Sequence, residues 1–136
     1  MVKLIMGLKG SGKTKTLVDL VVKAVSEENG DVVCIEKDKN LTYDIPYTAR
    51  LIHASEYGIN TNNLLRGFIC GLHAGNYDIT HVFIDNFYKL LDDSAPETVA
   101  DFLDWLDGFS SANNINFTIT ATDDAEKAPD RIKRYF

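Results

Sequence analysis

The stretch Gly7-Leu8-Lys9-Gly10-Ser11-Gly12-Lys13-Thr14 decides how the rest of the chain is interpreted. It follows a short apolar run, Val2 to Met6, and precedes a segment from Lys13 to Glu28 in which apolar residues recur at helical spacing. The eight residues fit the pattern G-x-x-x-x-G-K-[ST], whose glycines let the backbone wrap closely around a phosphate group. We therefore expect a strand, a phosphate-binding loop and a helix, in this order.

Each residue type in the loop has a defined role in holding a nucleotide. Lys13 is expected to reach the β- and γ-phosphates as a point charge, and the hydroxyl of Thr14 to ligate Mg²⁺. Free backbone N–H groups at the start of the helix face the anion, and nearby lysines add positive charge. The residues expected to bind the nucleotide are Gly7, Lys9, Gly10, Ser11, Gly12, Lys13, Thr14 and Lys15.

The motif and its position between a strand and a helix resemble the P-loop NTPase superfamily, and the resemblance implies binding of ATP or GTP with Mg²⁺. The second signature of that superfamily is an apolar run followed by Asp on a neighbouring strand. Val82-Phe83-Ile84-Asp85, 72 residues after Lys13, is similar to it. The resemblance implies that Asp85 and Thr14 are the metal-binding residues, with Asp85 acting through water. The choice between ATP and GTP stays open, because no guanine-binding N-K-x-D motif is present.

The catalytic residues are less clearly marked. Many ATPases of this superfamily place Glu after the Mg²⁺ aspartate, but this chain has Asn86, and an amide cannot act as a general base. The RecA-like branch instead places a base at the end of the strand after the P-loop helix, where Glu36 and Asp38 become the candidates. A solvated charged turn is the competing interpretation. Thr120 and Thr122 are candidates for γ-phosphate contacts from a last strand lying between the other two.

Three functions stay open. The first is a slow NTPase whose hydrolysis awaits a protein partner or self-assembly. The second is a phosphotransferase acting on a small molecule, although such kinases close an arginine-bearing lid and the only cations from Asp85 to Ala128 are Lys89 and Lys127. The order of elements is loosely similar to the core of thymidine kinase, without its zinc-binding cysteines. The third is a non-enzymatic nucleotide-sensing module that responds through a surface such as Lys37 to Pro46.

The rest of the chain alternates strand and helix patterns, which predicts a mainly parallel sheet. Thr61 is the expected cap of one helix, and Ser94-Ala95-Pro96-Glu97 is a capping-box pattern that predicts the start of another. We expect residues 1–136 to form one α/β domain with the P-loop NTPase fold, a three-layer sandwich around a mostly parallel sheet of about five strands. The further strands are expected at Asp31–Glu36, Arg50–Ala54, His81–Ile84 and Asn116–Thr122.

Composition excludes several functional classes. The 136 residues, 45% of them apolar, suit one folded domain. The 20 acidic residues outnumber the 14 basic ones and give a net charge of −6, which argues against nucleic acid as a partner. No segment approaches 18 apolar residues, and the apolar start is too short for a signal peptide, so we expect a cytoplasmic protein without membrane association. Cys34 and Cys70 match neither a zinc site nor a disulfide framework.

Overall fold

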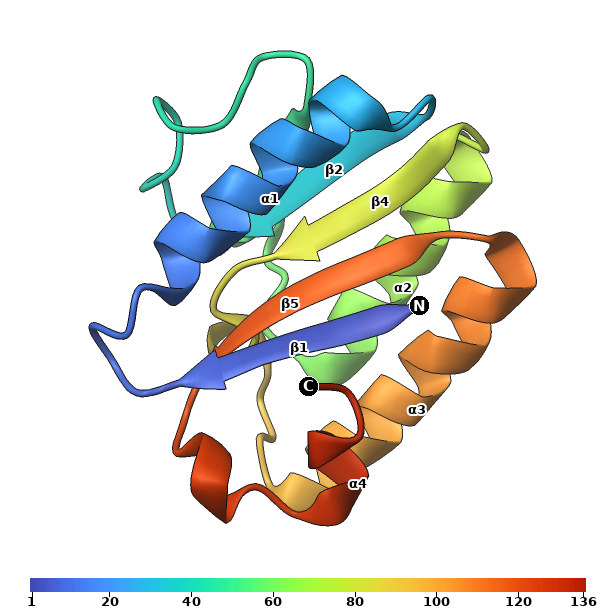
Figure 1. The fold of residues 1–136 in the computed structure, drawn as a ribbon. Helices are drawn as coiled ribbons and strands as arrows, with labels where there is room; N and C mark the ends of the chain where they lie inside the picture. The colour runs from blue at the N-terminus through green and yellow to red at the C-terminus, as the bar shows by residue number, and fades with distance from the viewer.

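The computed structural model describes residues 1–136 as an open five-stranded sheet with helices on both faces (Figure 1). The strands run in the order β1-β5-β4-β2-β3, and all four pairings are parallel. The predicted α/β class and five-stranded parallel sheet are confirmed. None of the helices has the length and apolar character of a membrane span. In chain order the elements are β1 (Val2–Gly7), α1 (Lys13–Glu27), β2 (Asp31–Glu36), β3 (Arg50–His53), α2 (Asn62–Gly75), β4 (Ile79–Ile84), α3 (Pro96–Asn113), β5 (Asn116–Thr122) and α4 (Asp130–Lys133).

Three strands end together at one edge of the sheet. Because β1, β5 and β4 are parallel, the segments that follow Gly7, Thr122 and Ile84 leave the sheet on the same side. β5 lies between β1 and β4, so β4, which Asp85 directly follows, does not pair with β1. Thr120 and Thr122 therefore lie on a strand between the other two, as expected from the sequence.

The two faces of the sheet are covered unequally. Helices α2 and α3 pack on one face around a core of 25 buried residues, whereas α1 packs on the other around 9. Figure 1 shows α1 over the β2 and β4 side of the sheet, with no helix over β1 and β5 on this face. On this second face β5 presents Thr118 and Thr120, while the alternate residues Phe117 and Ile119 enter the larger core. This face therefore carries buried polar side chains on β5 beside the apolar cluster under α1.

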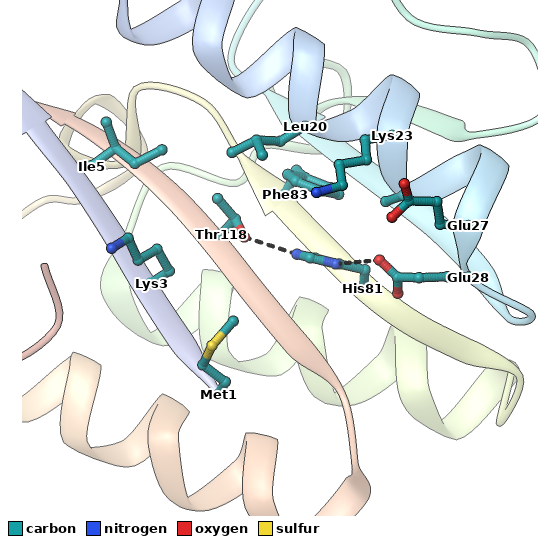
Figure 2. A pocket seen from close by; sticks show the side chains of 11 residues that line it. Met1, Lys3, Ile5, Leu20, Lys23, Glu27, Glu28, His81, Phe83 and Thr118 are labelled. Atoms are coloured by element: carbon teal, nitrogen blue, oxygen red, sulfur yellow. Dashed lines mark hydrogen bonds and ion pairs between the residues drawn. The ribbon is translucent and has the colours of Figure 1, made fainter.

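The buried side chain of His81 lies on the same face and forms hydrogen bonds with Glu28 and Thr118. His81 Nδ1 lies 2.8 Å from Glu28 Oε2, and its Nε2 lies 2.8 Å from Thr118 Oγ1 (Figure 2). The ring stacks on Phe83 with the centroids 4.0 Å apart. Burial lowers the pKa of His81, and the hydrogen bond to Glu28 only partly opposes this effect. The neutral ring satisfies both contacts, donating from Nδ1 to Glu28 and accepting the Thr118 hydroxyl at Nε2.

We expect the free energy of unfolding to rise with pH in the window just below 6.5, the ordinary pKa of histidine. The lowered pKa of His81 means that the unfolded chain takes up this proton at a higher pH than the folded protein, so protonation favours unfolding. Urea unfolding between about pH 5 and pH 7 measures the slope. His81→Gln should remove this contribution, whereas His73→Gln, outside this hydrogen-bonded chain, should leave it in place. A His81 contribution of opposite sign would contradict the assignment.

The predicted capping of α2 is confirmed, and the predicted capping of α3 is wrong. Thr61 Oγ1 accepts the N–H of Leu64 at 3.0 Å, as expected for an N-cap. Helix α3 begins at Pro96 with Ala95 as its N-cap and has no side-chain cap from Ser94. Asp93 instead accepts the N–H of Ala95 at 2.9 Å and the hydroxyl of Thr98 at 3.0 Å. These contacts with Asp93 hold the start of α3 in place of a capping box.

Candidate functional site

A cavity of about 630 Å³ lies at the carboxyl edge of the sheet, beside the glycine-rich loop of residues 7–14. Its volume is typical of small-molecule sites, which span roughly 300 to 1,000 Å³. No carboxylate lines it, although the protein as a whole carries a net charge of −6. The cavity therefore concentrates positive charge and suits an anion. Its lining consists of Lys9, Gly10, Gly12, Lys13, Thr14, Lys15, Asn86, Lys89 and Thr122.

Two glycines give the loop its shape. Gly10 and Gly12 have φ angles of 83° and 84°, in the left-handed region where a Cβ is costly. Gly12 is also the N-cap of α1, and Lys13, Thr14 and Lys15 in the first turn line the cavity. The first N–H groups of a helix lack partners within it and attract anions. No acidic side chain lies in this turn to compete for them.

Lys13 is the one cation of the cavity that is buried. Its exposed fraction is 8%, and Nζ donates to the carbonyl oxygen of Leu8 at 3.0 Å and to Ser11 Oγ at 3.4 Å. None of the ion pairs in the protein includes it. Lys15, by contrast, is exposed and pairs with Asp19 at 3.1 Å. A buried ammonium group without a counter-charge is costly, and an anion in the cavity offsets that cost.

Asp85 lies behind the lining of the cavity, next to Thr14. Its exposed fraction is 4%, and its two oxygens lie 3.2 and 3.3 Å from Thr14 Oγ1, which donates to them. Thr120 Oγ1 donates to the same carboxylate at 2.7 Å, and Asn86 Nδ2 donates at 3.3 Å. The structure thus brings together the two residues that the sequence assigned to metal binding.

The oxygen atoms of Thr14 and Asp85 fit a Mg²⁺ ion that shares its shell with a bound anion. Mg²⁺ prefers oxygen ligands and is commonly held by one or two carboxylates together with water and substrate phosphates. The protein has no group of three or more His, Cys, Asp or Glu side chains that would hold a metal by themselves. Thr14 and Asp85 are therefore the side chains that could supply oxygen ligands to a cation beside the glycine-rich loop.

Of the two threonine candidates, one lines the cavity and the other supports it. Thr122 is in the lining, and its hydroxyl lies 3.4 Å from Asn86 Oδ1. Thr120 is fully buried and accepts the backbone N–H of Asn86 at 2.9 Å while donating to Asp85. Asn86 has a φ of 53°, a left-handed conformation that Asn tolerates better than most residues. Thr120 therefore positions both the turn at Asn86 and the carboxylate of Asp85.

Thr120→Val should destabilise the protein by about 1 to 3 kcal/mol at similar side-chain volume, because it leaves the Asn86 N–H without its partner and removes the 2.7 Å hydrogen bond to the buried Asp85 carboxylate. Thr122→Val is the matched control, because Thr122 is exposed on the same strand and should change stability by less than about 0.5 kcal/mol. Urea unfolding of both variants measures the difference. Equal costs at the two positions would contradict the supporting role of Thr120.

The candidate catalytic residues Glu36 and Asp38 do not line the cavity. The buried carboxylate of Glu36 accepts the backbone N–H groups of Asn40 and Leu41 at 2.9 to 3.2 Å and lies 3.3 Å from His53 Nδ1. Asp38 is exposed, and its carbonyl oxygen lies 2.8 Å from the same histidine nitrogen. Both residues hold the segment after β2 in place, and their catalytic role stays a prediction.

Lys89 is a site residue that sequence reasoning missed. It belongs to a short 3-10 helix, Phe87–Leu90, that follows Asp85 and Asn86. Phe87 and Leu90 are fully buried, and Lys89 between them is exposed and lines the cavity. The only sequence signal is that Phe87 and Leu90, three positions apart, flank Lys89. A pattern of four residues is too short to predict a helical turn by periodicity.

Comparison with known proteins does not assign a function to this site. No protein-family model matches the chain, and no curated protein is significantly similar to it in sequence. The interpretation of the site therefore depends on its own residues.

Proposed function

We propose that this chain is a P-loop nucleotide-binding protein that holds ATP or GTP with Mg²⁺ at the glycine-rich loop. The observation that carries the proposal is the cavity at the carboxyl edge, lined by four lysines and no carboxylate, in which the buried Lys13 has no protein counter-charge. A polyphosphate supplies that charge. The glycine-rich loop between a strand and a helix supports the same assignment.

Each part of the cavity has a role in this proposal. Lys13 and the N–H groups of the first turn of α1 bind the phosphates, while Lys89 and Thr122 contact the terminal phosphate from the other wall. Thr14 and Asp85 hold the Mg²⁺ ion, which when bound neutralises charge on the phosphate oxygens. Thr120 keeps Asp85 in place through its 2.7 Å hydrogen bond.

The proposed activity is slow hydrolysis that a protein partner or self-assembly accelerates. The lining contains neither a carboxylate to activate water nor an arginine to stabilise transition-state charge, and Asn86 occupies the position after Asp85. A second protein surface is the natural source of the missing groups, since arginine fingers supplied in trans accelerate such reactions by about 10³- to 10⁵-fold.

A nucleotide-sensing module without turnover is the second candidate, and the segment after β2 favours it. Tyr43 is fully exposed and Tyr47 is 98% exposed. Leu41, which precedes Tyr43, and Ile45, which lies between the two tyrosines, pack in the smaller core and anchor the segment. Exposed aromatic side chains held on an anchored segment are suited to contact with a partner. In this alternative the bound nucleotide changes the position of that segment.

Calorimetric titration with ATP, GTP, CTP and UTP, each with and without Mg²⁺, tests the binding step, and phosphate release with and without candidate acceptors tests the reaction. Slow phosphate release after tight binding supports the NTPase, and tight binding without turnover supports the sensing module. Robust acceptor-dependent ADP formation would show a phosphotransferase instead. The absence of binding by all four nucleotides overturns the proposal as a whole.

A further inference from the structure

A second cavity, of about 340 Å³, lies on the partly open face of the sheet, near the carboxyl end of α1 (Figure 2). Its walls come from α1 and from the three strands β1, β5 and β4. None of the residues that line it lines the cavity beside the glycine-rich loop. It is therefore a separate site, and its volume falls at the lower end of the range for small-molecule pockets.

One part of this cavity is apolar and well anchored. Phe83 is fully buried and stacks on His81, so its position is fixed. Ile5 from β1 and Leu20 from α1 are half-buried beside the same space. An apolar ring or short chain placed here would remove Ile5 and Leu20 from water, which is favourable at about 25 cal/mol per Å².

The other feature of the cavity is a pair of exposed lysines without ion-pair partners. Lys3 on β1 and Lys23 on α1 lie on two sides of the space, with Thr118 between them in Figure 2. Neither lysine takes part in an ion pair of the protein. The two ammonium groups therefore remain available to a ligand.

Two carboxylates also line the cavity, and both keep their negative charge, but they differ in how far they are held in place. Glu28 is occupied, because Oε1 accepts the hydroxyl of Thr80 at 3.0 Å and Oε2 lies 2.8 Å from His81. Glu27 is exposed and stands four residues after Lys23 on α1, at the spacing of a weak helix ion pair. Only Glu27 is thus free to turn toward the lysines, because hydrogen bonds to Thr80 and His81 hold Glu28 in place.

We propose that this cavity binds a small amphipathic organic acid, with an apolar ring or chain packed on Phe83, Ile5 and Leu20. The carboxylate of the bound acid lies between the ammonium groups of Lys3 and Lys23. The site is additional to the nucleotide site and does not depend on it.

Calorimetric titration with 2-naphthoate tests the proposal, with 2-naphthalenemethanol as the uncharged probe of the same ring system. We expect one molecule of 2-naphthoate per chain and weaker binding of the alcohol. Lys3→Gln and Lys23→Gln should each weaken 2-naphthoate binding about 2- to 5-fold, the range for exposed charge pairs. Glu27→Gln should strengthen it, because the competing carboxylate is removed. The exposed Lys37, which lies outside the cavity, provides the control Lys37→Gln.

A second pair of variants tests the location. Ala24 on α1 is 5% exposed and lines the cavity, whereas Val22 on the same helix is 48% exposed and does not. Ala24→Phe fills the space and should abolish binding, and Val22→Phe should leave it unchanged.

Several outcomes overturn the proposal. The first is equal binding of the acid and the alcohol, and the second is no effect of either lysine substitution. The third is a stable dimer that Ala24→Phe dissociates, because the cavity would then be a contact between two copies of the chain. Binding of 2-naphthoate should persist in Lys13→Ala, so this proposal and the nucleotide proposal can fail independently.

Discussion

Lys13→Ala should abolish the rise in melting temperature that we expect ATP with Mg²⁺ to produce in the unsubstituted protein. A ligand that binds only the folded state stabilises it by about 2.7 kcal/mol at 100 times its dissociation constant. Lys13 is the buried cation of the cavity and has no carboxylate partner, so its loss removes the strongest attraction for the phosphates. Thermal unfolding with increasing ATP concentration measures the effect.

Two controls separate binding from stability in this experiment. Lys13→Ala also removes the hydrogen bonds from Nζ to the Leu8 carbonyl oxygen and to Ser11, so the melting temperature without nucleotide has to be measured for the variant. Lys37→Ala removes an exposed lysine outside the cavity and should keep the full nucleotide-induced shift. A shift that survives in Lys13→Ala would refute the assignment of the loop.

Asp85→Asn should remove most of the Mg²⁺ dependence of nucleotide binding and leave binding without Mg²⁺ nearly unchanged. The substitution keeps the size of the side chain and an oxygen that accepts from Thr120, but it removes the negative charge beside Thr14. Loss of a group that holds a metal through an intermediate ligand typically weakens metal affinity by about 10- to 100-fold. Calorimetric titration of ATP at several Mg²⁺ concentrations measures the change.

Asp123→Asn is the matched control for Asp85→Asn. Asp123 follows β5 at the same edge of the sheet, but it is exposed and does not line the cavity. Its substitution removes the same charge at the same edge and should leave the Mg²⁺ dependence as it is. If both variants behave alike, the effect at position 85 is a general change of surface potential and Asp85 does not hold the ion.

Much of the fold could be predicted because its elements have strong local patterns. The β-branched run at Asp31–Glu36 and the apolar alternation at Asn116–Thr122 match β2 and β5 at both ends. The predicted strand His81–Ile84 is two residues shorter than β4, which begins at Ile79. There Ile79 is buried and Thr80 is not, so the continuous apolar run begins only later.

Side-chain partners were harder to predict than elements. Ser94 has the sequence context of a capping box, but Asp93 makes the contacts at the start of α3, since cap geometry depends on how the chain approaches the helix. Glu36 has the position of a RecA-like base, but backbone N–H groups from the following segment occupy its carboxylate. Neither arrangement has a signal in residue spacing.

The glycine-rich loop and its flanking strand and helix follow from local sequence alone. Backbone preference and hydrophobic period act over a few residues, so the left-handed conformations of Gly10 and Gly12 and the start of α1 at Lys13 follow from local composition. Which distant residues meet at the loop depends instead on how the strands pair. Asp85 reaches Thr14 across 71 positions because parallel strands end at one edge of the sheet, and the same pairing places Lys89 in the cavity. The second cavity likewise exists only because α1 leaves part of the sheet uncovered, a property of packing that no local pattern contains.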